Sequence, residues 1–140
     1  MYRNFVQGLC QRNMLGFCTG PVDHVTPVFV IKKNGKLRLV WDCRGAKRRF
    51  RDAPPLAMAS GSKWGDLAVP EGEKLYLAQS DVKDFFYALG LSDKLGMFFC
   101  LPPIPGYLLK TWGVSFSDGG GHELHTNVYP YLKVVPMGWN

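Results

Sequence analysis

The sequence predicts an α+β domain, because stretches that favour β-strands are interspersed with short segments that favour helices. The clearest strand signals lie in residues 28–43, and Ser92 is suited to begin a short helix. The chain has 140 residues, of which 46% are apolar. That length is enough for one domain with a hydrophobic core, and the apolar content argues against a disordered chain.

A β-hairpin is expected in residues 28–43. Val28–Ile31 is β-branched and aromatic, as strands prefer. Asn34-Gly35 suits a two-residue type I′ turn, in which both central residues need a positive φ. The return strand alternates, with Leu37, Leu39, Trp41 and Cys43 on one face and Arg38, Val40 and Asp42 on the other. We therefore expect strands 28–33 and 37–43 to pair antiparallel around this turn.

Helical and loop segments are expected elsewhere. Residues 2–19 have weak helical periodicity and predict a short helix followed by a loop. Residues 52–73 are rich in Pro, Gly, Ser and Ala, and predict a loop with one helical turn around Trp64–Leu67. Ser92 is expected to cap a short helix that begins at Asp93.

Three further extended segments are expected. Leu75–Gln79 predicts a strand that runs into Ser80-Asp81. Met97–Leu101 predicts a strand that ends at Pro102-Pro103, because proline cannot donate a ladder hydrogen bond. Residues 129–135 are expected to be extended.

Cysteine spacing and the absence of long apolar runs bear on the cellular compartment. The four cysteines are widely and irregularly spaced, which suits free thiols in a reducing compartment better than disulfides or a zinc site. The N-terminus has no long apolar stretch before a small-residue cleavage site, and no apolar run approaches membrane-spanning length. We therefore expect an intracellular protein, cytoplasmic or nuclear, with no signal peptide and no membrane partner.

Positive charge is concentrated in one segment. Residues 32–51 hold nine basic residues and one acid, a net charge of +8, whereas the whole chain carries +6. Such a segment indicates a polyanionic partner, although a solvated basic face is an equal alternative on charge alone. The candidate nucleic-acid contacts are Lys47, Arg48, Arg49 and Arg51.

Two aspartates follow the expected strand at 75–79. Asp81 and Asp84 lie three residues apart on tight structure, where carboxylates can present oxygens to a hard divalent cation. In polymerases, such a cation bridges the incoming phosphates and the attacking 3′-hydroxyl. An aspartate at a strand end is also commonly a cap or a salt-bridge partner, so both interpretations stand on the spacing alone.

Three segments resemble one enzyme family. Asp81–Phe86 (Asp-Val-Lys-Asp-Phe-Phe) resembles the first catalytic motif of retroviral and retrotransposon reverse transcriptases, RNA-directed DNA polymerases. Val28–Lys33 followed by Arg38–Arg44 resembles the fingers hairpin of that family. Val135–Trp139 resembles the Leu-Pro-Gln-Gly-Trp segment that opens the family's second palm motif. The three segments occur in the family's order, and the resemblance covers about residues 26–140, although residues 104–128 match nothing in the family pattern.

The resemblance implies a partial right-hand polymerase fold, with a fingers β-hairpin and part of an antiparallel palm sheet with short helices. Residues 1–25 would form an N-terminal helix and loop segment. Residues 26–73 would form the fingers-like hairpin and a connecting loop. Residues 74–140 would form a partial palm that ends at the start of the second palm motif.

The resemblance also implies metal and sugar-selecting residues. Asp81 would be the catalytic carboxylate and would bind Mg²⁺ or Mn²⁺ together with the backbone carbonyl of Val82. Phe86 occupies the place of the family's steric gate, a ring that excludes a ribose 2′-hydroxyl. Lys33 and Arg38 would clamp the triphosphate, since Lys offers phosphate a point charge and Arg a bidentate fork.

Further nucleotide-binding positions follow from the same pattern. Asp84 would line the nucleotide pocket, and Gly138 would let backbone approach the nucleotide and template. The chain departs from the family at Met137, where many members have Gln, at Lys47, which replaces a common Asn, and at Phe85, which replaces a small residue. Met137 is nevertheless expected at the nucleotide, where a polar contact would be lost or moved.

The implied reaction is RNA-templated transfer of deoxynucleotides to a primer 3′-hydroxyl by two-metal phosphoryl transfer. The implied partners are an RNA template, a DNA primer, deoxynucleoside triphosphates and the remaining part of the polymerase. The family's Tyr-x-Asp-Asp hairpin is absent from these residues, so we expect this chain alone to be inactive. Two alternatives stay open: a non-catalytic, basic nucleic-acid-binding remnant of a retroelement, and an unrelated α+β domain in which Asp-x-x-Asp is incidental.

Overall fold

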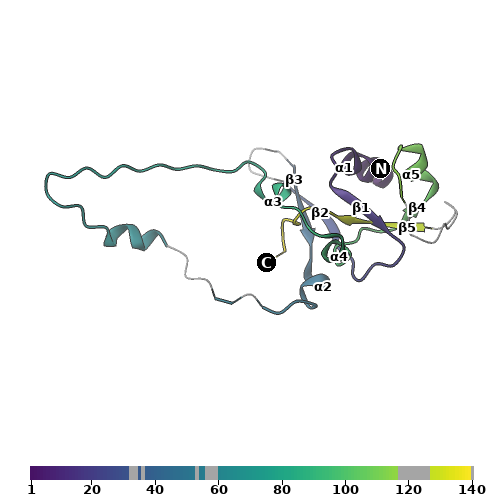
Figure 1. Cartoon of the computed structure of the whole chain (residues 1–140), viewed down its shortest axis with the longest axis horizontal. Helices are drawn as coiled ribbons and strands as arrows, with labels where there is room; N and C mark the ends of the chain where they lie inside the picture. The colour runs from purple at the N-terminus through teal and green to yellow at the C-terminus, as the bar shows by residue number, and fades with distance from the viewer. Residues whose placement is uncertain (32–34, 36, 53, 56–59, 117–126, 140) are drawn as a thin grey trace. The chain divides into compact units, whose positions relative to one another are not determined.

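The computed structural model of the chain describes residues 1–31, 35, 37–52, 54–55, 60–116 and 127–139 (Figure 1). They divide into two units, one formed by Met1–Phe50 with Asp84–Asn140 and the other by Arg51–Lys83. The chain mixes short helices with small antiparallel sheets, so the α+β prediction is confirmed. The right-hand polymerase fold stays a prediction.

A three-stranded antiparallel sheet forms the centre of the first unit. Its strands are β1 (Leu15–Cys18), β5 (Asn127–Leu132) and β4 (Ile104–Pro105), in the order β1-β5-β4. Leu15 lies opposite Leu132, and both are buried. Of the segment predicted to be extended, 129–135, the residues up to Leu132 belong to β5.

Helices α1 (Tyr2–Gln11) and α5 (Tyr107–Thr111) bury apolar side chains in the core of this unit, and Figure 1 shows both helices near β1 and β4. The short helix predicted within residues 2–19 is confirmed. The loop predicted after it is wrong in part, because β1 begins at Leu15. Leu15 is 5% exposed, and burial against the core favours a paired strand where local sequence indicated none.

The strand predicted at Met97–Leu101 is not formed. Residues 97 and 98 form a turn and residue 99 a bend, and of residues 97–101 only Cys100 makes bridges, to His24 and Tyr131. Helix α4 (Asp93–Gly96) is the physical reason, because the amides of Phe98 and Phe99 bond back to Leu95 and Gly96 at 3.2 and 2.8 Å. Those turn hydrogen bonds use the amides that a strand would offer to its neighbour.

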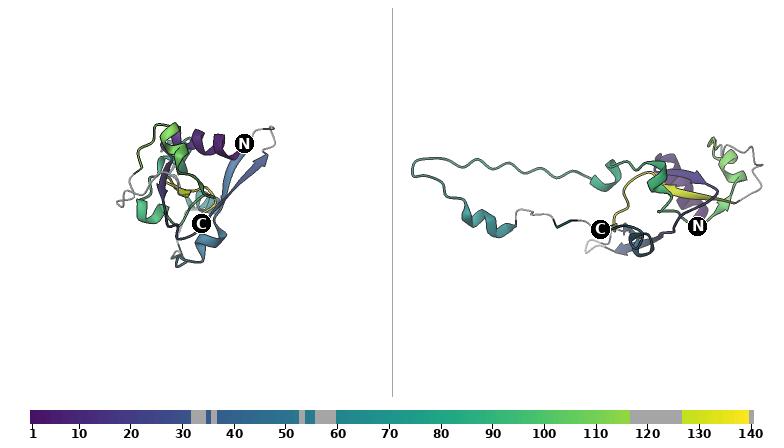
Figure 2. Two further views of the ribbon diagram at one scale, coloured as in Figure 1. Left: turned by 90° about the vertical axis from the view of Figure 1, so that its right-hand side faces the viewer. Right: turned by 60° about the horizontal axis from the view of Figure 1, so that its bottom comes forward.

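The capping residue of α4 is the one that the sequence predicts. Ser92 precedes the helix, and its side-chain oxygen accepts a hydrogen bond from the Leu95 amide at 3.4 Å. The other short helices of the first unit are α2 (Arg44–Lys47) and α3 (Phe85–Ala88), which Figure 2 shows from two further directions.

The predicted hairpin is present as a two-stranded antiparallel sheet of β2 (Thr26–Ile31) and β3 (Leu37–Asp42). Its register differs from the prediction. Ile31 lies opposite Leu37, whereas a two-residue turn at positions 34 and 35 would place Ile31 opposite Arg38. Gly35 has the predicted positive φ of 74°, and Asn34 lies outside the described residues.

The alternation predicted for the return strand is confirmed where its side chains are described. Trp41 and Cys43 are buried at 1% and 2% exposure, and Leu39 packs against the core. Arg38 is exposed on the opposite face. All four cysteines are free thiols, as predicted.

The second unit contains the 3₁₀ helix η1 (Gly61–Asp66), which agrees with the helical turn predicted near that point. The strand predicted at Leu75–Gln79 is wrong, because residues 73–82 have no regular structure. These residues are all exposed, and the described part of this unit offers no strand to pair with them. A strand without a partner lacks the ladder hydrogen bonds that stabilise it.

No helix in the described ranges is long and apolar enough to cross a membrane.

Candidate nucleotide and nucleic-acid site

Strand β3 and the C-terminal segment around Gly138 are in direct backbone contact. The amide of Trp41 donates a hydrogen bond to the carbonyl of Met137 at 2.8 Å. Gly138 has a φ of 114°, and a Cβ at this position would lie 2.5 Å from the Trp41 carbonyl oxygen. Only glycine tolerates both the dihedral and the close approach. Gly138 thus makes its close approach to this chain's own strand, and the predicted approach to nucleotide and template stays a prediction.

The same contact fixes Arg38. Its Nε donates to the Sδ of Met137 at 3.0 Å, and its guanidinium makes no ion pair within the part of the chain that the structure describes. The side chain is exposed, so its remaining N–H groups are available to an anion. A thioether is a weak acceptor, so this contact orients the fork without neutralising its charge.

Helix α3 joins the same face of the first unit through Tyr87. The hydroxyl of Tyr87 donates to the Leu39 carbonyl at 3.3 Å. Burial raises the pKa of Tyr87, the negative charge of Asp84 raises it further, and Arg38 acts in the opposite sense. Asp84 itself has a left-handed backbone, with φ 55° and ψ 34°.

The side chain of Phe86 is 36% exposed, and its ring contacts that of Phe85 edge-on at a centroid separation of 5.9 Å. Both rings of this aromatic pair are partly accessible to solvent, with Phe85 50% exposed. Three predicted nucleotide-binding positions, Arg38, Met137 and Gly138, therefore belong to one contact network. Two more, Asp84 and Phe86, lie at the start of α3, which Tyr87 links to β3.

The predicted metal-binding residues belong to the second unit. Asp81 and Val82 lie in its irregular C-terminal stretch, and both are exposed. The exposed carboxylate of Asp81 agrees with the prediction, but its position at a strand end does not, because the strand is absent. No group of three or more His, Cys, Asp or Glu side chains is placed to hold a metal ion within the described ranges. Lys33 lies outside the described residues.

Two basic residues, one in α2 and one directly after it, are exposed and accessible to a phosphate group. Lys47 and Arg48 make no ion pair with any residue that the structure describes. Arg44 differs, because it donates to both carboxylate oxygens of Asp42, at 2.8 and 2.7 Å. These hydrogen bonds lower the pKa of Asp42 to about 2.

Arg49 is also engaged within the chain. Its Nε donates to Asp23 at 3.1 Å, and the other carboxylate oxygen of Asp23 accepts from the His24 amide at 2.8 Å. Arg51 belongs to the second unit and is exposed. The basic residues of this segment therefore differ in how strongly they can attract a phosphate. In the part of the chain that the structure describes, a carboxylate partly neutralises Arg44 and Arg49, but not Lys47 or Arg48.

Tyr87 belongs to this network although the sequence gives it no functional role. Its ring is half-buried, and its hydroxyl links α3 to β3. A phenol on a short helix gives no sequence signal for a partner 48 positions away. No protein-family model, no curated protein and no solved structure matches this chain.

Proposed function

We propose that this chain is the fingers and first palm portion of a reverse transcriptase, which holds a deoxynucleoside triphosphate with Mg²⁺ and contacts an RNA template and DNA primer. In this proposal Asp81 is the metal-binding carboxylate, Arg38 binds the triphosphate, and Phe86 excludes the ribose 2′-hydroxyl. The second metal-binding carboxylate pair would come from the Tyr-x-Asp-Asp hairpin that the resemblance implies beyond these residues.

The observation that carries the proposal is the contact of β3 with two segments that are far apart from it in the sequence. The Trp41–Met137 backbone hydrogen bond joins two segments that each resemble a reverse transcriptase motif. The Tyr87–Leu39 hydrogen bond links β3 to α3, whose first residues Phe85 and Phe86 end the third such motif. An incidental Asp-x-x-Asp in an unrelated domain gives no reason for these three segments to be in contact.

Triphosphate binding by the purified chain tests the proposal without requiring a complete polymerase. We expect a fluorescent deoxynucleoside triphosphate to bind more tightly with Mg²⁺ than with EDTA. Arg38→Ala should weaken binding in both conditions by about tenfold, because it removes a charge-assisted phosphate contact. Asp81→Asn should remove only the Mg²⁺-dependent part.

Matched variants control for the loss of charge alone. Arg3→Ala removes an exposed arginine of α1, and Asp66→Asn removes an exposed carboxylate of η1, so both should bind like the parent. Triphosphate binding that Arg38→Ala and Asp81→Asn leave unchanged would contradict the proposal.

Lys47 and Arg48 favour nucleic-acid binding, which the non-catalytic alternative shares, because both are exposed and have no internal ion pair in the described residues. The two functions separate in the same assay. A nucleic-acid-binding remnant would bind duplex or single strands but would show no Mg²⁺-dependent triphosphate affinity.

A further inference from the structure

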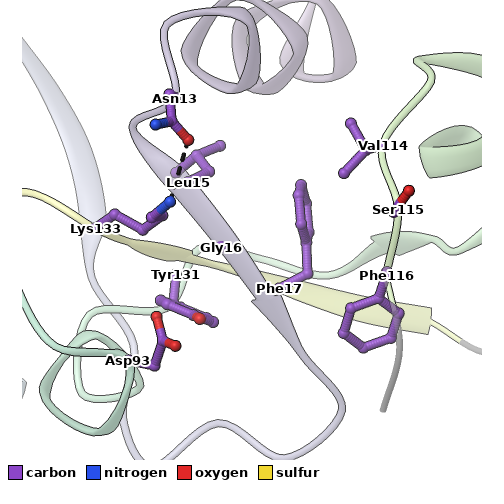
Figure 3. Close-up of a pocket in the computed structure, with 10 residues that line it drawn as sticks. All are labelled: Asn13, Leu15, Gly16, Phe17, Asp93, Val114, Ser115, Phe116, Tyr131 and Lys133. Atoms are coloured by element: carbon purple, nitrogen blue, oxygen red, sulfur yellow. Dashed lines mark hydrogen bonds between the residues drawn. The ribbon is translucent and has the colours of Figure 1, made fainter. Parts of the chain in front are cut away.

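A small cavity of about 380 Å³ lies beside β1 (Figure 3), and neither Arg38 nor Met137 lines it. Its volume is at the lower end of the range for small-molecule sites, roughly 300–1,000 Å³. Part of its wall comes from residues 13, 15–17 and 114–116, which lie outside the segments that resemble a reverse transcriptase. None of the described residues that line the cavity has a role in the proposed function.

One wall of the cavity is rigid because Tyr131 is held between two glycines. A Cβ at Gly16 would lie 2.3 Å from the Tyr131 ring, and a Cβ at Gly96 would lie 2.6 Å from it. The ring is buried, and its hydroxyl donates a hydrogen bond to Asp93. Burial and this hydrogen bond raise the pKa of Tyr131, so the phenol stays protonated and holds the carboxylate of Asp93 in place.

A positive charge lines the same cavity. The Nζ of Lys133 donates to the Oδ1 of Asn13 at 3.1 Å, the dashed contact in Figure 3. Lys133 and Asp93 each have a neutral hydrogen-bond partner, and neither makes an ion pair within the described residues. Two opposite charges at one small cavity, each positioned by a neutral group, match a ligand that carries both charges.

Apolar side chains form the other side of the cavity. Phe17, Val114 and Phe116 are half-buried against the core and lie across Gly16 from Lys133 and Asp93 (Figure 3). Aromatic side chains at a pocket wall favour a flat apolar group by edge or offset stacking. The ligand therefore needs a ring at one end and two opposite charges at the other.

We propose that this cavity binds a free aromatic α-amino acid. Lys133 donates to its carboxylate, its ammonium group donates to Asp93, and its ring lies against Phe17 and Phe116. A peptide with an N-terminal aromatic residue offers the same ring and ammonium group but no carboxylate on the same carbon, so the carboxylate contact distinguishes the two sources.

Binding of L-phenylalanine to the purified 140-residue chain, followed by ligand-detected NMR without nucleotide or Mg²⁺, tests this proposal. Three probes each lack one feature: phenylalaninamide lacks the carboxylate, N-acetylphenylalanine lacks the ammonium group, and alanine lacks the ring. Each should bind about tenfold or more weakly than L-phenylalanine, because each loses one charge-assisted or ring contact.

A substitution of Lys133 tests whether this residue contacts the carboxylate of the ligand. Lys133→Met should weaken binding of L-phenylalanine and leave the weaker binding of phenylalaninamide unchanged, since only the former has a carboxylate for Lys133. Lys110→Met removes an exposed lysine of α5 that does not line the cavity, so it should leave both affinities unchanged.

Three results would overturn the proposal. L-phenylalanine could fail to bind at millimolar concentration, phenylalaninamide could bind as tightly as L-phenylalanine, or Lys133→Met could weaken the binding of both probes equally. The probe series needs no substitution, so it decides the question even if a variant folds poorly. Because no nucleotide is present, a failure of L-phenylalanine to bind would not contradict the polymerase proposal. A failure of triphosphate binding would likewise not contradict the amino-acid proposal.

Discussion

At the scale of single residues, the basic residues near α2 should contribute unequally to nucleic-acid binding, because a carboxylate of the chain already pairs with some of them. Lys47→Ala and Arg48→Ala should each weaken nucleic-acid binding across all sequences and lower the salt slope by about 1, because each removes one phosphate contact with its counterion release. Arg49→Ala should change the slope less, because Asp23 already accepts its Nε hydrogen. Fluorescence anisotropy with a labelled RNA–DNA duplex at several salt concentrations measures the slopes.

Two further variants sharpen that comparison. Asp23→Ala should strengthen binding, because it releases Arg49 for a phosphate contact. Arg3→Ala, on α1, should leave the slope unchanged. Equal slopes for all four basic-residue variants would show that net charge alone governs binding.

The Asp42–Arg44 pair makes a second prediction at this scale. The lowered pKa of Asp42, about 2, means that its carboxylate stabilises the folded state above its ordinary range near 4. That contribution is lost as the pH falls through about 2. An NMR titration of the Asp42 carboxyl carbon should therefore have a midpoint near pH 2, and Arg44→Gln should raise the midpoint toward about 4. Lys47→Gln, on the same helix, should leave it unchanged.

At the scale of elements, the contact between β3 and the C-terminal segment depends on one glycine. Gly138→Ala should destabilise the fold by about 1–3 kcal/mol, because alanine resists a φ of 114° and its Cβ meets the Trp41 carbonyl. Denaturant unfolding followed by tryptophan fluorescence measures the loss. Gly20→Ala is the matched control, since no atom lies within 4 Å of its added Cβ, and it should cost little.

The same variant connects stability with the proposed function. If the contact between Met137 and β3 orients Arg38, Gly138→Ala should also weaken triphosphate binding under conditions where the variant is still folded. A variant that loses stability but keeps its full triphosphate affinity would assign the contact to folding alone.

At the scale of the whole molecule, the core belongs to one unit. Every buried residue of the core lies in Met1–Phe50 or Asp84–Asn140, within the part of the chain that the structure describes. Replacing residues 52–82 with a flexible Gly/Ser linker of similar length should therefore leave the midpoint of denaturant unfolding close to that of the parent. Loop-closure entropy depends only weakly on length, so the linker itself adds little.

That replacement separates folding from the proposed chemistry. It removes Asp81 and Val82, so the Mg²⁺-dependent part of triphosphate binding should disappear while near-UV circular dichroism stays the same. Loss of cooperative unfolding would show that Arg51–Lys83 contributes to the core after all.

The sequence by itself determined the elements whose signals are local. The N-cap at Ser92 needs only a hydroxyl and the amide three residues on, and the burial of Trp41 follows from alternation along one strand. The antiparallel pairing predicted for 28–33 and 37–43 needed only two neighbouring runs of strand formers, although its bounds and register differ in the structure. Helix α1 likewise followed from its own periodicity.

Tertiary structure decided what depends on distant partners. Leu15–Cys18 is a strand because β5 lies beside it, whereas Leu75–Gln79 has strand-forming residues but no neighbouring strand in the described part of its unit. Local hydrogen bonds of α4 outweighed strand preference at 97–99. The contacts that join Arg38 to Met137 and Tyr87 to Leu39 span 99 and 48 positions. No local pattern encodes such contacts, because they form only when the core brings those segments together.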